Sequence, residues 1–304
     1  MSVNSSPAPR DVLPQIDLAA SQTVSRKTSH NTSRWLQDEI ASRMAQRLSF
    51  IRQPPTRWID WEPRTGGLAS LSLVQNIYPQ AKAIAVQPCG RDVDWLVGVR
   101  QPRWWQWWKR HQCEYAQSHE LAADMLWSNL CLHQHARPLE LMMAWSQALN
   151  PQGFVMFSCL GPDSLRELRE LYRLQSWPEP HHAFTDMHDW GDMLLEAGFS
   201  QPVMDMERLT LTYDSADELL QDLRAWGRNL HPLRYPGTRT KAWRAELLAQ
   251  LSVALASNTH PGKLVLSLEI IYGHAFKAAV RHAVKPLTQV ALSDMRRMLQ
   301  SPSA

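Results

Sequence analysis

The chain has 304 residues, of which 44% are hydrophobic, and a formal net charge of +3 at pH 7. This length and apolar content suffice for a sizeable globular core in one large domain or two small ones. The small positive excess, with no dense block of Lys and Arg, argues against a nucleic-acid partner. Because no run of about 18 apolar residues and no apolar signal core occur, we expect a cytoplasmic protein without a transmembrane segment.

The hydrophobic pattern alternates between helical and strand periods along the chain. Strands that alternate with helices in this way indicate an α/β fold with a largely parallel sheet. In chain order we predict a helix over 35–48, a strand over 57–61, a helix over 68–77, strands over 83–86 and 124–127, a helix over 138–149, a strand over 154–159, helices over 163–173 and 189–197, a strand over 203–213, helices over 214–226 and 239–256, and a last strand over 264–272.

Composition divides the chain into an arm, a domain and a tail. Residues 1–33 are rich in Ser, Thr, Asn and Pro and carry few large apolar side chains, so they cannot offset their ordering entropy by burial. We predict a mobile arm over 1–33, one domain over 34–290 and a tail over 291–304. Residues 214–258 form a helical insertion between the last two strands of that domain.

The stretch after the first predicted strand lies where nucleotide-binding α/β domains keep a loop of the type Asp-x-Gly-x-Gly-x-Gly. Asp60 and Gly66 are in register with that pattern, but Glu62 and Arg64 occupy its two inner glycine positions. Glycines there allow a positive φ and a close approach to the ligand. Gln87 ends the second strand, where an acid often accepts hydrogen bonds from ribose hydroxyls. Because the glutamine side chain carries no charge, we expect weaker binding of a nucleoside than a carboxylate would give.

Residues 88–120 follow the expected alternation poorly and contain four tryptophans in close succession, Trp104, Trp105, Trp107 and Trp108. Three of them fall on one helical face, which is typical of an amphipathic helix packed on the sheet. The alternative is a docking surface for a membrane or an apolar partner, supported by the adjoining basic pair. The pattern alone leaves both open.

Six motifs along the chain are long and specific. They are Ser128 to His133 (SNLCLH), Phe157 to Leu168 (FSCLGPDSLREL), Phe184 to Asp192 (FTDMHDWGD), Ala197 to Phe199, Pro202 to Glu207, and Glu269 to Ala275 (EIIYGHA). They resemble the malonyl-acyl-carrier-protein O-methyltransferases of biotin synthesis, and the resemblance covers roughly residues 34–276. It implies a class I S-adenosylmethionine-dependent methyltransferase: a Rossmann-like α/β fold with a seven-stranded, mostly parallel sheet, helices on both faces and a helical lid over 214–258.

The resemblance also implies which residues meet S-adenosylmethionine. Asp60 and Gly66 match the first loop of the family, Gln87 matches the ribose-binding acid in position alone, and Ser128, Asn129 and His133 match the loop that lines the methyl-transfer site. Two arrangements are open for the intruding side chains. Glu62 and Arg64 pair and plug the site, or Arg64 meets the carboxylate of the cofactor while Glu62 meets its ammonium group.

The methyl acceptor implied by the resemblance is the free carboxylate of a malonyl thioester on acyl carrier protein. A carboxylate is already a nucleophile at neutral pH, so alignment and exclusion of water suffice and no general base is needed. We therefore look for a cation that holds the acceptor. Arg228, at the end of the predicted lid helix, is the candidate, although a surface arginine at a helix C-terminus is equally typical. His188 is interpreted as a pocket-lining residue.

No metal site is expected. His181, His182, His188, Asp186 and Asp189 are close in sequence, but their spacing fits no common zinc pattern. The four cysteines are far apart and form no Cys-x-x-Cys pair. Two functions remain open: an S-adenosylmethionine-dependent methyltransferase, favoured by the loop at 128–133, or a catalytically lapsed relative that keeps the fold as a binding or assembly factor, favoured by the altered glycine loop.

Overall fold

The computed structural model describes residues 16–21, 35–67, 69–88, 95–100, 114–115 and 121–279. Its centre is a sheet with the strand order β4-β3-β2-β1-β5-β6-β8-β7. The strands are β1 (Arg57–Trp61), β2 (Lys82–Pro88), β3 (Trp95–Arg100), β4 (Glu114–Tyr115), β5 (Ala123–Ser128), β6 (Leu149–Leu160), β7 (Phe199–Tyr213) and β8 (Leu264–Lys277). The four tryptophans of 104–108 lie outside the described residues.

The central strands of the sheet are parallel and its two edges are not. β1 pairs in parallel with β2 and β5, and β5 with β6, whereas β8 is antiparallel to both β6 and β7. At the other edge β3 is antiparallel to β2 and to β4. The predicted count of seven strands is therefore corrected to eight. The connection 89–94 is shorter than the crossover of roughly a dozen residues that a parallel strand needs, so β3 returns in the opposite direction.

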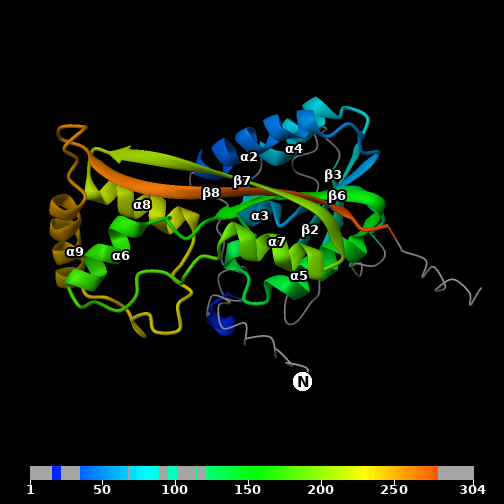
Figure 1. The fold of residues 1–304 in the computed structure, drawn as a ribbon. Helices are drawn as coiled ribbons and strands as arrows, with labels where there is room; N and C mark the ends of the chain where they lie inside the picture. Colours follow the sequence, from blue (N-terminus) through cyan, green and yellow to red (C-terminus); the bar gives the residue numbers. More distant parts are fainter. Residues whose placement is uncertain are drawn as a thin grey trace, which may run out of the picture.

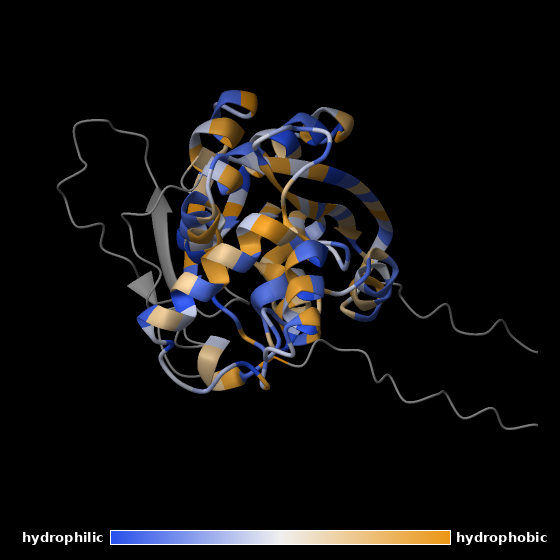
Figure 2. Cartoon of the chain, turned by 90° about the vertical axis from the view of Figure 1, so that its left-hand side faces the viewer, coloured by the Kyte–Doolittle hydropathy of each residue, from blue (hydrophilic) through white to orange (hydrophobic). Residues whose placement is uncertain are grey.

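Helices cover both faces of this sheet, with α2 and α4 on one side and α5 and α7 on the other (Figure 1). The helices are α2 (Trp35–Arg47), η1 (Leu48–Phe50), α3 (Pro63–Gly66), α4 (Ala69–Ile77), η4 (Leu132–Gln134), α5 (Pro138–Ala148), α6 (Arg166–Leu174), α7 (Met187–Glu196), α8 (Ala216–Trp226) and α9 (Lys241–Ala254). Hydrophobic and hydrophilic bands alternate along them (Figure 2), as expected for amphipathic helices that bury one face.

Neighbouring residues of β1 point to opposite faces of the sheet and so belong to different cores. Trp58 packs with Leu36 and Met44 of α2, whereas Ile59 packs on the side of Trp145 in α5. All five side chains are at most 1% exposed. The adjacent parallel strands β1, β2 and β5 separate these two cores, and their carboxyl ends lie together at one edge of the sheet.

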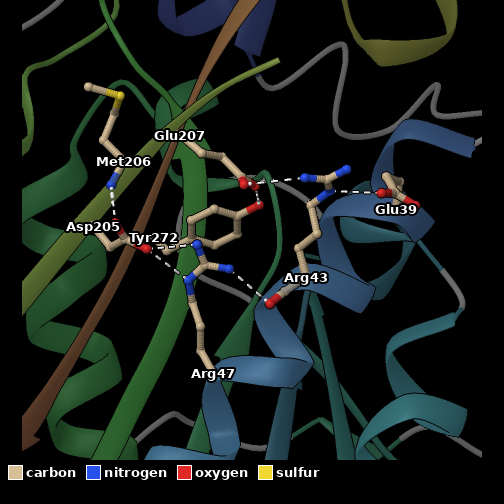
Figure 3. Close-up of polar contacts among 7 residues, drawn as sticks. All are labelled: Glu39, Arg43, Arg47, Asp205, Met206, Glu207 and Tyr272. Atoms are coloured by element: carbon tan, nitrogen blue, oxygen red, sulfur yellow. Dashed lines mark hydrogen bonds and ion pairs between the residues drawn. The ribbon is translucent and has the colours of Figure 1, made fainter.

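A polar network fixes α2 to the β7–β8 ribbon (Figure 3). Arg43 pairs with Glu207 at 3.3 Å, and Glu207 also accepts a hydrogen bond from the hydroxyl of Tyr272. Arg47 pairs with Asp205 at 2.7 Å, and its guanidinium lies 3.7 Å from the centre of the Tyr272 ring. The opening helix is thereby held on strands that follow it by more than a hundred residues.

The lid consists of α8 and α9, which lie between β7 and β8 in the chain and stand with α6 at one end of the molecule (Figure 1). Part of the predicted arm, residues 16–21, packs against the loop that follows α8. Asp17 forms an ion pair with Arg234 at 2.8 Å, and the hydroxyl of Ser21 donates to the carbonyl of Gln134. Within the described residues no helix has both the length and the apolar character needed to cross a membrane.

Candidate active site at the carboxyl edge of the sheet

The residues predicted to bind the cofactor gather where β1, β2 and β5 end. Carboxyl ends of parallel strands meet at one edge of an open sheet, which is where ligands of such folds sit. Of this set only Arg64 is exposed. Asp60, Glu62, Gln87, Ser128, Asn129 and His133 are each at most 7% exposed, and Gly66 is also buried. The predicted site is therefore assembled, but its side chains face other parts of the chain.

The backbone of Glu62 has the left-handed conformation that glycine adopts easily, with φ 54° and ψ 54°. A residue with a Cβ pays roughly 1–2 kcal/mol for this conformation. The turn is nevertheless well made, because the amides of Thr65 and Gly66 both donate to the Glu62 carbonyl at 2.9 Å. The amide of Glu62 itself donates to the carbonyl of Val86 at 2.7 Å. The path of a glycine loop is kept although its first inner glycine is absent.

The side chain of Glu62 turns inward and meets His135. Its Oε1 lies 2.5 Å from Nε2 of His135, and the Glu62 side chain is only 4% exposed. Burial alone would lower the pKa of His135, but the charge of Glu62 and the hydrogen bond between them raise the pKa of the imidazole. A charge-assisted hydrogen bond of this kind contributes about 1.5–3 kcal/mol, enough to offset the backbone strain.

This contact excludes the first of the two arrangements left open for Glu62 and Arg64, in which their side chains pair with each other. Arg64 lies on the surface, and its side chain forms no ion pair with any described residue. The left-handed turn at Glu62 starts the short helix α3, and here Glu62 is buried whereas Arg64, two residues later, is exposed. His135 was not among the predicted site residues. The available signal was its position, two residues after His133 in the loop that follows β5.

The side chain of Gln87 also forms a hydrogen bond within the protein. Its Oε1 accepts a hydrogen bond from the backbone amide of Arg64 at 3.1 Å. Its Nε2 is buried without a partner among the described residues. The residue at the position of the ribose-binding acid therefore supports the loop, and one unsatisfied amide nitrogen remains beside it.

Asn129 joins three elements through its side-chain amide. Its Nδ2 donates to the carbonyls of Gln37 in α2 and Gly66 in α3, at 2.8 and 2.5 Å, and its Oδ1 accepts from the Ser158 hydroxyl at 2.7 Å. The contact also explains the glycine at 66, because a Cβ there would lie 2.7 Å from the carbonyl oxygen of Asn129. Asn129 thus acts as a structural junction.

A cavity of about 230 Å³ lies between this edge of the sheet and the lid. His133 and Leu160, at the ends of β5 and β6, line one side, and Trp226 lies on the lid side. Arg224 and Arg228 also line it; both are exposed, and neither forms an ion pair or hydrogen bond with another described residue. None of the lining residues is acidic. Within the described part of the chain, the cavity is therefore lined by two arginines without ion-pair partners and by no carboxylate.

Three buried imidazoles surround Phe184 in the wall of this cavity. The ring of His181 stacks on Phe184 at 4.9 Å, and the rings of His182 and His133 meet its edge at 5.0 and 5.5 Å. Burial lowers the pKa of His181 and of His182 to about 4, and it lowers the pKa of His133 well below its ordinary value. The part of the cavity wall that these three imidazoles form is consequently uncharged at neutral pH.

Comparison with known proteins identifies the chain. Residues 33–201 match the family described as methyltransferase domain. A malonyl-[acyl-carrier protein] O-methyltransferase of Gallionella capsiferriformans is 36% identical over 266 residues, which cover 83% of this chain and 87% of that protein. The protein of the same name from Laribacter hongkongensis is 34% identical, with 81% and 84% covered. The chain belongs to the malonyl-acyl-carrier-protein O-methyltransferase family.

The sheet agrees with this assignment. Its parallel centre, with antiparallel β8 between β6 and β7 and helices on both faces, confirms the Rossmann-like α/β fold expected from the sequence, apart from the strand count. Among solved structures, a SAM dependent methyltransferase from Archaeoglobus fulgidus aligns with a TM-score of 0.40 at 12% identity, covering 79% of this chain and 94% of that chain.

The methyl donor of this methyltransferase family is S-adenosylmethionine, so the edge of the sheet can be tested for its fit. The resemblance implies that the donor meets the glycine loop after β1, the residue at the end of β2 and the loop after β5. Here Glu62 is bonded to His135, Gln87 to the backbone of Arg64, and Asn129 to two carbonyls. In this arrangement the residues do not fit the cofactor, because the side chains that would meet it are buried and bonded to other parts of the protein.

His188 lies away from the lid cavity. Its side chain is 81% exposed and its Nδ1 is 2.6 Å from Oδ1 of Asp186. Asp186 caps α7 by accepting from the His188 amide, so the motif FTDMHDW starts a helix on the surface. The interpretation of His188 as a pocket-lining residue is corrected accordingly.

Among the residues that the structure describes, no group of three or more His, Cys, Asp or Glu is arranged to hold a metal ion.

The buried imidazoles predict an acid-sensitive fold. With pKa values of about 4, His181 and His182 stay neutral in the folded protein, while the unfolded chain protonates them below its ordinary value of about 6.5. The unfolded state then binds more protons, so stability is lost as the pH falls from about 6.5 towards 4. Each imidazole contributes up to about 1.4 kcal/mol per pH unit. Urea unfolding at pH 7 and pH 5 measures this loss; equal stability at both would contradict it.

Proposed function

We propose that this chain is an S-adenosylmethionine-dependent methyltransferase that methylates the free carboxylate of a malonyl thioester carried on acyl carrier protein, as a step of biotin synthesis in the cytoplasm. The observation that carries the proposal is the lid cavity, which lies beside the loop after β5 and is lined by Arg224 and Arg228, neither of which pairs with another residue that the structure describes. Relatives named for this reaction, aligned over most of both chains, support it.

The chemistry of the acceptor suits such a cavity. A carboxylate needs no base to attack a methyl group, and burial lowers the pKa of the imidazoles in the cavity wall, which makes them weak bases. Guanidinium groups bind carboxylates with two parallel hydrogen bonds, which orient the acceptor as well as hold it. Phe184, Leu160 and Trp226 provide apolar surface that excludes water from the acceptor.

The test is a methyl-transfer assay with the full-length protein, malonyl-acyl carrier protein and S-adenosylmethionine, followed by mass spectrometry of the carrier. We expect the malonyl form to gain one methyl group and the acetyl form, which lacks a free carboxylate, to gain none. Methylation of both forms, or of neither at saturating donor, would contradict the proposal.

A second candidate is a carrier-binding protein that performs no methyl transfer. The buried contact between Glu62 and His135 favours it, because this contact closes the loop that would hold the donor. The two candidate functions are distinguished by measuring carrier binding and methyl transfer on the same sample. Saturable binding of malonyl-acyl carrier protein without any methyl transfer supports the second candidate, and transfer excludes it.

A further inference from the structure

The chain departs from the family pattern at Glu62, in the glycine loop, and at Gln87, at the end of β2. The side chains of both residues contact the same short loop or hold it in place. Glu62 replaces the first inner glycine and bonds to His135, while Gln87 replaces the ribose-binding acid and bonds to the amide of Arg64. Both contacts hold the segment between β1 and α4. Glu62 and Gln87 therefore each make a contact within the protein that stabilises this loop.

The contact between Glu62 and His135 is the central one because it is buried at its acidic end. The Glu62 side chain is 4% exposed and that of His135 is 25% exposed. A buried carboxylate requires a partner, and among the described residues the hydroxyl of Thr65, at 3.4 Å, is the other polar contact of this side chain. The closed loop therefore depends on His135, which belongs to the loop after β5 and not to the glycine loop.

We infer that Glu62 and His135 form an internal latch on the cofactor loop, and that S-adenosylmethionine binds to the form in which this latch is open. The inference rests on the proposed function, since it concerns the donor site of the same reaction. Where the binding-competent form is a small fraction of the protein, the affinity is reduced by that fraction. Substitutions that open the latch therefore tighten binding of the cofactor.

The experiment measures binding and not activity. S-adenosylhomocysteine is titrated calorimetrically into the full-length protein and into Glu62→Gly, His135→Asn and the double variant. Glycine also suits the left-handed backbone at this position. We expect Kd to fall about tenfold or more in each single variant, with no further gain in the double variant because both substitutions open one contact.

Arg64→Ala is the matched control, since Arg64 occupies the other inner position of the loop but is exposed. Its Kd is expected to stay within about threefold of the wild-type value. An unchanged or weaker affinity of Glu62→Gly overturns the latch, and so does an equal gain in Arg64→Ala. If Glu62→Gly fails to fold, as judged by circular dichroism, His135→Asn decides the question alone.

The outcome for the latch is independent of the outcome for the reaction. Tighter binding of S-adenosylhomocysteine without methyl transfer in any variant supports the latch and contradicts the proposed function. Methyl transfer by the wild type, with the same Kd in wild type and Glu62→Gly, overturns the latch and leaves the proposed function standing.

Discussion

Replacing Arg228 with methionine is expected to remove the preference of the protein for a malonyl acid over its methyl ester. In the wild type, malonyl-acyl carrier protein should bind about 10- to 100-fold more tightly than the monomethyl ester, the range expected for hydrogen bonds from a guanidinium to a carboxylate. In Arg228→Met the two ligands should bind with similar affinity. Titration calorimetry with both carriers measures the ratio, and contacts made by the carrier protein itself cancel in it.

Two further variants sharpen this measurement. Arg228→Lys keeps the charge but loses the paired donors, so an intermediate ratio is expected. Arg173→Met is the control, because Arg173 lies on α6 in an exposed ion pair with Glu170 and does not line the lid cavity. A wild-type ratio in Arg228→Met would show that this arginine does not hold the carboxylate, and would direct attention to Arg224.

The second large effect is expected at Asn129, on stability. Asn129→Ala leaves the carbonyls of Gln37 and Gly66 and the hydroxyl of Ser158 without their side-chain partner in a buried site. Each unsatisfied buried group costs about 1–3 kcal/mol, so we expect the free energy of unfolding to fall by about 3 kcal/mol or more. Urea unfolding followed by circular dichroism gives this value directly.

Asn76→Ala serves as its control, since Asn76 is exposed on α4 and its side chain makes no hydrogen bond with another described residue. Its effect is expected to stay within about 0.5 kcal/mol. If Asn129→Ala unfolds like the wild type, the amide is not the junction that the hydrogen bonds indicate. A variant that keeps full stability but loses cofactor binding would instead make Asn129 a binding residue.

Much of the fold could be predicted because its helices and strands are strongly periodic and their ends carry turn residues. The predicted helix over 189–197 is α7, and the predicted strand over 264–272 is the first part of β8. Residues 150–153, which separate the predicted helix over 138–149 from the predicted strand over 154–159, lie inside β6, where Gln152 has a φ of 67° and the register with β5 shifts. Turn residues there mark an irregularity within a strand, which periodicity alone cannot separate from a loop.

The candidate site was only partly predictable. Strand order brings the ends of β1, β2 and β5 together, so the positions of Asp60, Gln87 and Asn129 followed from the pattern. Side-chain direction did not follow, because it depends on the left-handed turn at Glu62 and on which partner lies within reach after folding. His135 is separated from Glu62 by more than seventy residues, and no local pattern connects them.

The contacts of residues 16–21 with the rest of the protein link the start of the chain to the lid. Asp17 is attached to the loop after α8 through Arg234, and Ser21 to the loop after β5 through Gln134, so this segment joins the two loops. Any movement that separates these loops must break one of the two attachments. Displacement of the lid from the end of β5 is therefore mechanically coupled to release of the leading segment.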